Sequence, residues 1–157
     1  MQAVHFYRTR RINISSSRDS LNGYQKGKCF YCFRDIVIDS PDQDQMADVD
    51  HFFPHVLLQA HPEMNLNGVW NLVLSCKECN RGEDGKFASV PDLYLLKRLW
   101  TRNEFFIKSH HPLRETLKNQ TGLTDQSRIV FLQKMDSLAI GSLIHRWKPR
   151  IELEPAF

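Results

Sequence analysis

The four cysteines of this sequence fall into two pairs, and two residues separate the members of each pair. Cys29 and Cys32 lie in the segment CFYC, and Cys76 and Cys79 lie in CKEC. This spacing lets both sulfurs of a pair turn toward one metal ion from a tight turn. Redox chemistry needs only one such pair, in a thioredoxin-like βαβ setting that the sequence does not show. We therefore predict one structural zinc ion bound by all four cysteines.

A carboxylate and an imidazole are adjacent between the two pairs, and an amide follows the second pair. Asp50 and His51 open the segment DHFFP, and Asn80 comes directly after Cys79. A zinc ion held by both pairs would bring these three side chains into one small volume. Imidazole can take a proton from water near neutral pH, which suits His51 to the role of general base in a hydrolysis. Asp50 and Asn80 offer hard oxygen ligands for a magnesium-type ion.

Taken in order, these residues resemble the zinc-bound, four-cysteine branch of the HNH endonucleases, also called His-Me finger or ββα-metal nucleases. That branch has a cysteine pair, Asp-His at a strand end, an Asn heading a short apolar run, and a second cysteine pair followed by Asn or His. The matching stretch runs from Cys29 to Asn80, and Asn71 heads the apolar run. The family name implies His at the last position. Asn80 resembles the variant found in junction-resolving and RNA-guided nucleases.

The resemblance implies a fold, a reaction and a role for each residue. In that family the Asp and the final Asn or His bind the catalytic ion, Mg²⁺ or Mn²⁺, and the products carry 5′-phosphate and 3′-hydroxyl ends. The first His is the general base, and the middle Asn orients the loop that holds it. These roles would fall to Asp50 and Asn80, to His51, and to Asn71.

The elements that must position these residues are expected to be short. The β-branched run Ile36 to Ile38 predicts a strand over residues 34–38. Further strands are expected over 46–53, which delivers Asp50 and His51, and over 71–75. A short helix is expected over 17–25, and the helix of the ββα unit is expected to begin near Cys79 or Asn80, with Arg81 and Lys86 in its first turns. Residues 39–48 lack the Gly and Glu of a calcium loop and are predicted to be a solvated turn. Residues 55–69 are predicted to be a loop.

Beyond Pro91 the apolar residues recur with helical spacing. Pro91 suits the first turn of a helix, whose apolar face would comprise Leu93, Leu96, Leu99, Trp100, Phe106 and Ile107. A second helix is expected over 112–120, ending at Gly122. A third is expected to start at Thr124 as N-cap, with Ile129, Leu132, Met135, Ala139 and Leu143 on its apolar face. These helices would form a platform for a zinc-bound core that is too small to be stable alone.

We therefore predict an α+β fold, a zinc-stapled ββα-metal core with additional C-terminal helices. Residues 1–157 would form a single domain, with the core over about 25–90 and the helical part over about 91–148. No apolar run approaches the ~18 residues of a membrane span, and no signal peptide is evident. We expect a cytoplasmic protein. The formal net charge is only +3, so attraction to DNA would have to come from a local patch.

The predicted function is that of a metal-dependent HNH endonuclease acting on DNA. Lys77, Arg81 and Lys86 flank the site and are candidate phosphate contacts, and so is the basic stretch with Arg8, Arg10, Arg11 and Arg18, although a solvated segment is the favoured interpretation of that stretch. The alternative function is a catalytically silent zinc module that binds nucleic acid or a protein partner. The choice of DNA over RNA, the substrate structure, the pathway and the oligomeric state stay open. So does membership of a larger complex or fusion.

Overall fold

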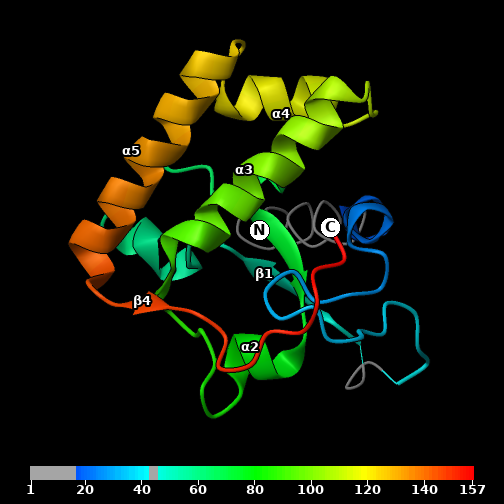
Figure 1. Ribbon diagram of the computed structural model, residues 1–157. Coiled ribbons are helices and arrows are strands. Elements are labelled where there is room, and N and C mark those ends of the chain that lie inside the picture. Colours follow the sequence, from blue (N-terminus) through cyan, green and yellow to red (C-terminus); the bar gives the residue numbers. More distant parts are fainter. Residues whose placement is uncertain (1–16, 43–45) are drawn as a thin grey trace, which may run out of the picture. The chain divides into compact units, whose positions relative to one another are not determined.

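The computed structural model describes residues 17–42 and 46–157 (Figure 1). The predicted basic N-terminal arm, apart from Arg18, lies outside the described residues. The chain forms two compact units that alternate along the sequence. Unit 1 comprises Met1–Asp50, Leu72–Gly85 and Pro149–Phe157, and unit 2 comprises His51–Asn71 and Lys86–Lys148. The prediction of one domain stays a prediction.

Unit 1 contains short elements around a two-stranded sheet. Residues 17–25 are helical. Strand β1 (Asp48–His51) pairs with β2 (Leu72–Ser75). All four residues of β2 are buried, as expected for an apolar strand covered on both faces. Both strands lie inside the predicted ranges but are shorter than predicted.

The predicted strand over residues 34–38 is wrong. This segment forms only two isolated bridges, Lys28 with Asp35 and Val37 with Met46. The chain reverses at Phe33, whose φ is 63°, and the amide of Cys29 donates to the carbonyl of Arg34 at 2.8 Å. The turn that presents the first cysteine pair therefore uses the backbone groups that a regular strand would need.

The helix after the second cysteine pair begins earlier than predicted and is shorter. α2 spans Lys77–Arg81, and Cys76 is its N-cap because its sulfur accepts from the amide of Cys79. Gly82 ends the helix, consistent with the low helix propensity of glycine. Asn80 and Arg81 thus lie in the last turn of α2, and Lys86 lies beyond it.

Unit 2 is largely helical. A 3₁₀ helix, η2 (His55–Gln59), interrupts the segment 55–69 that was predicted as a loop, and a second, η3 (Val69–Asn71), begins at its last residue and includes Asn71, which was predicted to start a strand. They are followed by α3 (Leu93–Lys108), α4 (Arg114–Thr121) and α5 (Asp125–Leu143). α4 contacts both α3 and α5 (Figure 1). The predicted cap at Thr124 is confirmed, because its hydroxyl accepts from the amide of Ser127 and the side chain of Ser127 accepts from the amide of Thr124.

Pro91 is not in the first turn of α3, as predicted, but in strand β3 (Val90–Pro91), which pairs in parallel with β4 (Arg146–Trp147). The amide of Val90 donates to the carbonyl of His145, which precedes β4, at 2.9 Å, and the amide of Asp92 donates to the carbonyl of Trp147 in β4 at 2.8 Å. Pro91, which has no N–H, occupies the position between them where no donor is needed. Asp92 is the N-cap of α3.

The buried core of unit 2 combines apolar and charged side chains. Leu99, Phe106 and Ile107 of α3 are buried as predicted, whereas Leu93 is exposed. Arg102 is fully buried and donates to the carbonyls of Val69 and Trp70 at 3.2 Å. Because a buried guanidinium needs partners for its N–H groups, these bonds fix η3 against α3.

A buried ion pair joins α5 to α3. Arg128 donates to both carboxylate oxygens of Glu104 at 3.0 and 3.1 Å.

Among the described residues, no helix is both long and apolar enough to cross a membrane.

Candidate functional site

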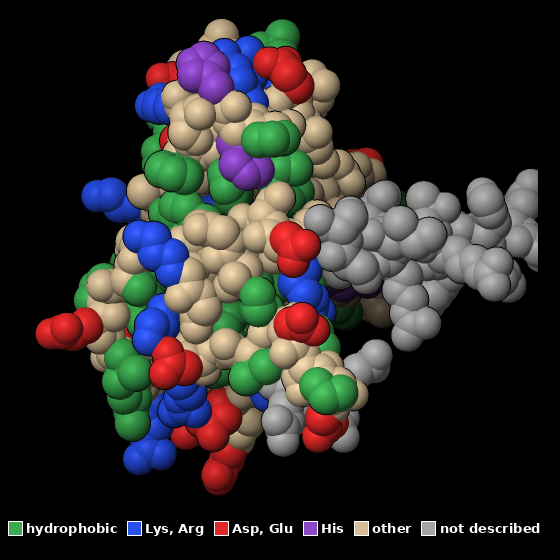
Figure 2. Space-filling view, turned by 90° about the vertical axis from the view of Figure 1, so that its right-hand side faces the viewer, with side chains coloured by type: hydrophobic (Ala, Val, Ile, Leu, Met, Phe, Trp, Pro, Cys, Tyr) green, Lys and Arg blue, Asp and Glu red, His purple; other side chains and the backbone are tan. Residues whose placement is uncertain are grey.

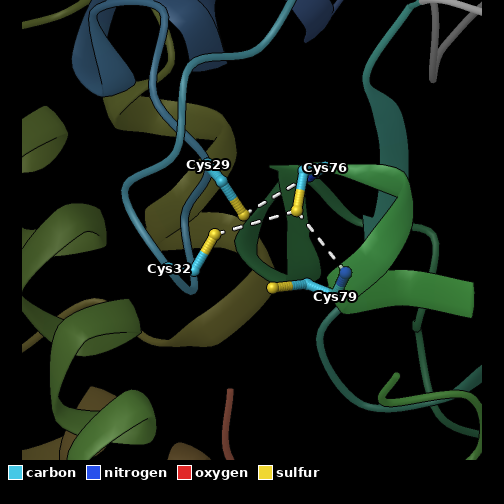
Figure 3. Close-up of side chains that lie close together, drawn as sticks. All are labelled: Cys29, Cys32, Cys76 and Cys79. Atoms are coloured by element: carbon cyan, nitrogen blue, oxygen red, sulfur yellow. Dashed lines mark hydrogen bonds between the residues drawn. The ribbon is translucent and has the colours of Figure 1, made fainter. Parts of the chain in front are cut away.

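The four cysteine side chains converge on one point in unit 1 (Figure 3). Cys29 and Cys32 come from the turn before Arg34, and Cys76 and Cys79 come from the end of β2 and from α2. All four are buried, and their sulfurs lie within 4.8 Å of one another. Zn–S bonds of about 2.3 Å place the sulfurs of a tetrahedral site about 3.8 Å apart. The Cys32 and Cys76 sulfurs lie 3.7 Å apart, so the donor set and its spacing fit a structural zinc ion.

Backbone amides support these sulfurs as thiolates. The amides of Tyr31 and Cys76 donate to the Cys29 sulfur at 3.4 and 3.3 Å. Hydrogen bonds from Cys32, Cys76 and Cys79 hold the pKa of the Cys29 thiol far below its usual range, whereas the contact with Cys29 raises the pKa of Cys79 well above it. Four thiolates this close repel one another, so a divalent cation is needed for all of them to be ionised.

An amide from α2 lies against a carboxylate of β1 in the same unit. Asn80 donates from Nδ2 to Oδ2 of Asp48 at 2.8 Å, across 32 positions of sequence. Arg81 also pairs with Asp48, at 3.2 Å. Since alternate residues of a strand face the same side, Asp48 and Asp50 share one face of β1. Asp50 is buried, and its Oδ2 accepts from the hydroxyl of Tyr31 at 2.7 Å. Burial, followed by the charge of Asp50, raises the pKa of Tyr31 well above its usual value.

His51 follows Asp50 in β1 and is held by groups of unit 2. Its Nε2 lies 2.8 Å from Oδ1 of Asn67. Its backbone carbonyl accepts from Nζ of Lys86 at 2.9 Å, and its ring centroid lies 5.3 Å from that of His55. The ring and the backbone of His51 are therefore each held by a side chain distant in sequence.

Asn71 is fully buried and links two segments of unit 2. Its Oδ1 accepts from the amide of Phe53 at 2.8 Å, and its Nδ2 donates to the carbonyls of Phe53 and Leu66 at 3.1 and 3.0 Å. The amide of Phe52 donates to the backbone carbonyl of Asn71 at 2.8 Å. Asn71 thus fixes the two residues that directly follow His51.

The structure places the predicted site residues in two groups. Asp50, Asn80 and the four cysteines belong to unit 1, and His51 and Asn71 belong to unit 2. Lys86, predicted as a phosphate contact on a helix, is instead 1% exposed and donates to the carbonyl of His51. On the face drawn in Figure 2, Lys and Arg side chains are interspersed with Asp and Glu.

Sequence reasoning missed three residues of these groups. Asp48 stood where the predicted turn (39–48) and the predicted strand (46–53) overlap and was given no role, although its position two residues before Asp50 gives both the same face of a strand. Tyr31 and Asn67 had no local signal, because their partners lie 19 and 16 positions away.

The comparisons with known proteins add no assignment: no protein-family profile, no curated protein and no solved structure matches the chain significantly. The metal centre and the residues around it therefore rest on the geometry and chemistry of this chain alone.

Proposed function

We propose that this chain is a metal-dependent endonuclease of the HNH type that hydrolyses phosphodiester bonds in DNA. The observation that supports this most is the bond between Asn80 and Asp48. It brings the amide that follows Cys79 in α2 against a carboxylate of β1, and Asp50 lies on the same face of that strand. Because Cys76 and Cys79 flank the start of α2, binding of zinc to them would fix the helix that carries Asn80.

Asp50 and Asn80 are the proposed ligands of the catalytic divalent ion, Mg²⁺ or Mn²⁺. Nδ2 of Asn80 donates to Asp48, and its Oδ1 is the acceptor end of the amide, the atom suited to a hard cation. Such an ion supplies charge neutralisation on the phosphate and a stabilised leaving oxygen. The hydroxyl of Tyr31 orients the carboxylate of Asp50.

His51 is the proposed general base, which takes the proton of the attacking water. Its backbone is held by Lys86 and the turn after it by Asn71. A general base acts only within hydrogen-bond reach of its proton. These fixed contacts support a precise position for the ring.

The second candidate function is a catalytically silent zinc module that binds nucleic acid or a protein. The same contacts also fit this function. Asn80 with Asp48 and Tyr31 with Asp50 are satisfied hydrogen-bonded pairs, and a purely structural role is enough to explain such pairs. Among the described residues on the face drawn in Figure 2, basic and acidic side chains are mixed, which does not favour DNA binding there.

Plasmid nicking under single-turnover conditions separates the two functions. Wild-type protein, His51→Ala and Asn80→Ala would be compared with Mg²⁺ or Mn²⁺, with His61→Ala as the matched histidine control in unit 2. We expect His51→Ala to slow nicking by about 10²–10⁴-fold while gel-shift affinity is kept. We expect Asn80→Ala to abolish nicking and to weaken Mg²⁺ or Mn²⁺ binding without loss of zinc.

Supercoiled, linear, single-stranded and branched DNA, together with RNA, would then define the substrate. Equal nicking by wild type and His51→Ala would remove His51 from the mechanism. Absence of nicking in every protein would leave the silent module as the function.

A further inference from the structure

The Nε2 nitrogen of His51 faces Asn67, a residue that has no role in the proposed function described above. Nε2 of His51 lies 2.8 Å from Oδ1 of Asn67. We propose that Asn67 is a positioning residue that keeps the hydrogen of the neutral ring on Nε2, so that Nδ1 is the nitrogen that accepts the proton from water. This inference rests on the proposed role of His51 as a general base.

The chemistry of the two groups leads to this tautomer. An amide oxygen can only accept a hydrogen bond, so the nitrogen that faces it must carry the hydrogen. A neutral imidazole has one N–H, and its other nitrogen has a lone pair. With Nε2 as the donor to Asn67, the basic atom is Nδ1. Asn67 therefore decides which atom of His51 accepts the proton, without itself touching the substrate.

The turn that carries Asn67 is fixed on both sides of that residue. The carbonyl of Asn65 accepts from Nε1 of the buried Trp70 at 2.9 Å, and the carbonyl of Leu66 accepts from Nδ2 of Asn71 at 3.0 Å. The carbonyl of Gly68 accepts from the amide of Asn71 at 3.0 Å. A site held in this way is preorganised, because the hydrogen bonds of the turn already fix the backbone that carries Asn67.

Gly68 shows how closely this turn approaches the core. A Cβ atom at this position would lie 2.6 Å from Cδ1 of Trp70, which is closer than non-bonded carbon atoms can pack. Only glycine lets the backbone next to Asn67 lie against the Trp70 ring.

Both partners of the hydrogen bond are tied to the same buried residue. Asn71 holds the turn of Asn67 through Leu66, and it holds the chain after His51 through Phe53. Lys86 adds the bond to the carbonyl of His51 itself. Because the donor and the acceptor share one rigid support, their separation is set by the fold of unit 2.

The test reads the tautomer directly, by ¹⁵N NMR of the histidine rings at a fixed pH where the rings are neutral. We expect His51 of the wild-type protein to have its hydrogen on Nε2. Asn67→Ala should give a mixture of both tautomers, and Asn67→Asp, which keeps an acceptor oxygen, should restore the Nε2–H form. Asn65→Ala is the matched control, since this exposed side chain lies on the same turn. Tryptophan fluorescence would verify that each variant is folded.

Single-turnover nicking by the same four proteins tests the positioning role. Loss of the hydrogen-bond partner that orients a metal-bound histidine typically lowers activity by about 10- to 100-fold, and we take the same range for the partner of His51. We expect that loss in Asn67→Ala, with unchanged gel-shift affinity and with recovery in Asn67→Asp. A wild-type ring with its hydrogen on Nδ1, or an Asn67→Ala protein with unaltered tautomer and rate, would overturn the inference.

The two readouts separate this inference from the proposed function. If wild-type protein does not nick DNA, the proposed function fails and Asn67 has no catalytic ring to position, whatever the NMR spectrum shows. If wild-type protein nicks but Asn67→Ala behaves like wild type in both assays, only the role of Asn67 fails.

Discussion

Replacing Asn71 by alanine should destabilise unit 2 more than replacing an exposed polar residue would. The side chain is fully buried and makes hydrogen bonds of 2.8, 3.1 and 3.0 Å. Each such bond contributes about 0.5–1.5 kcal/mol net, and an orphaned buried donor costs about 1–3 kcal/mol. Since these contributions are not additive, we expect Asn71→Ala to lower the free energy of unfolding by about 2–4 kcal/mol.

Asn71→Asp distinguishes the hydrogen bonds from the volume of the side chain. Aspartate has nearly the same shape and keeps an acceptor for the amide of Phe53. It replaces the Nδ2 donor by an oxygen that faces the carbonyls of Phe53 and Leu66, and it buries a charge. We therefore expect this near-isosteric change to cost more than alanine.

Urea unfolding followed by tryptophan fluorescence measures this effect in the right part of the chain. All three tryptophans, Trp70, Trp100 and Trp147, belong to unit 2. With a slope of about 2 kcal/mol per M, a loss of about 3 kcal/mol lowers the urea midpoint by about 1.5 M. Asn119→Ala is the control, because Asn119 is exposed on α4 and should change stability by less than about 0.5 kcal/mol. A shift below about 0.5 M for Asn71→Ala would refute the reasoning.

Three further outcomes are expected. Purified protein should contain one equivalent of zinc, and elemental analysis showing less than about half an equivalent would contradict this. A chelator should remove the zinc, and acid should release it by protonating the thiolates; in both cases unit 1 should unfold. The pKa of Tyr31 in the folded protein is raised above its usual value of 10.0. The stability that the protonated hydroxyl contributes is therefore present below pH 10.0 and is lost as the pH rises above it. Tyr31→Phe should flatten this alkaline loss of stability, measured by zinc release in urea. Lys86→Met keeps the buried stem but leaves the carbonyl of His51 without this donor, so fluorescence-detected unfolding should show a loss of about 1–3 kcal/mol, and an unchanged urea midpoint would argue against this bond.

Local signals in the sequence predicted the parts of the fold that depend on local chemistry. Thr124 was identified as an N-cap because it precedes a run of apolar residues with helical spacing, and the hydroxyl of a threonine there is itself the cause of the cap. The four cysteines were grouped correctly, since their spacing alone restricts what they can bind. α2 was placed too late because its N-cap is the sulfur of Cys76, a residue already assigned to the metal.

Contacts between distant segments determined what the sequence did not predict. The apolar run Ile36 to Ile38 has high strand propensity, yet strand propensity expresses packing against neighbours, and the turn before it takes its backbone partners. Lys86 was expected at the surface, as charged residues usually are. Its burial depends on the carbonyl of His51, which lies 35 positions earlier, and no local pattern encodes that contact.

The order of segments in unit 1 has a consequence for the timing of metal loading during synthesis. The first cysteine pair leaves the ribosome well before the second, since Cys32 and Cys76 are 44 positions apart. At about 5–20 residues per second, this gap lasts about 2–9 s. The last segment of the unit comes later still, after all of unit 2, and it completes the surroundings of the first pair. The amide of Leu153 donates to the carbonyl of Cys32 at 2.9 Å, and the ring of Phe157 lies 4.8 Å from that of Phe33.

During this interval Cys29 and Cys32 are two neighbouring thiols without their metal partners, open to oxidation and to capture of the wrong cation. The yield of correctly loaded protein in a cell should therefore depend on the supply of zinc and reductant while the chain is being made, and not only on the affinity of the finished site.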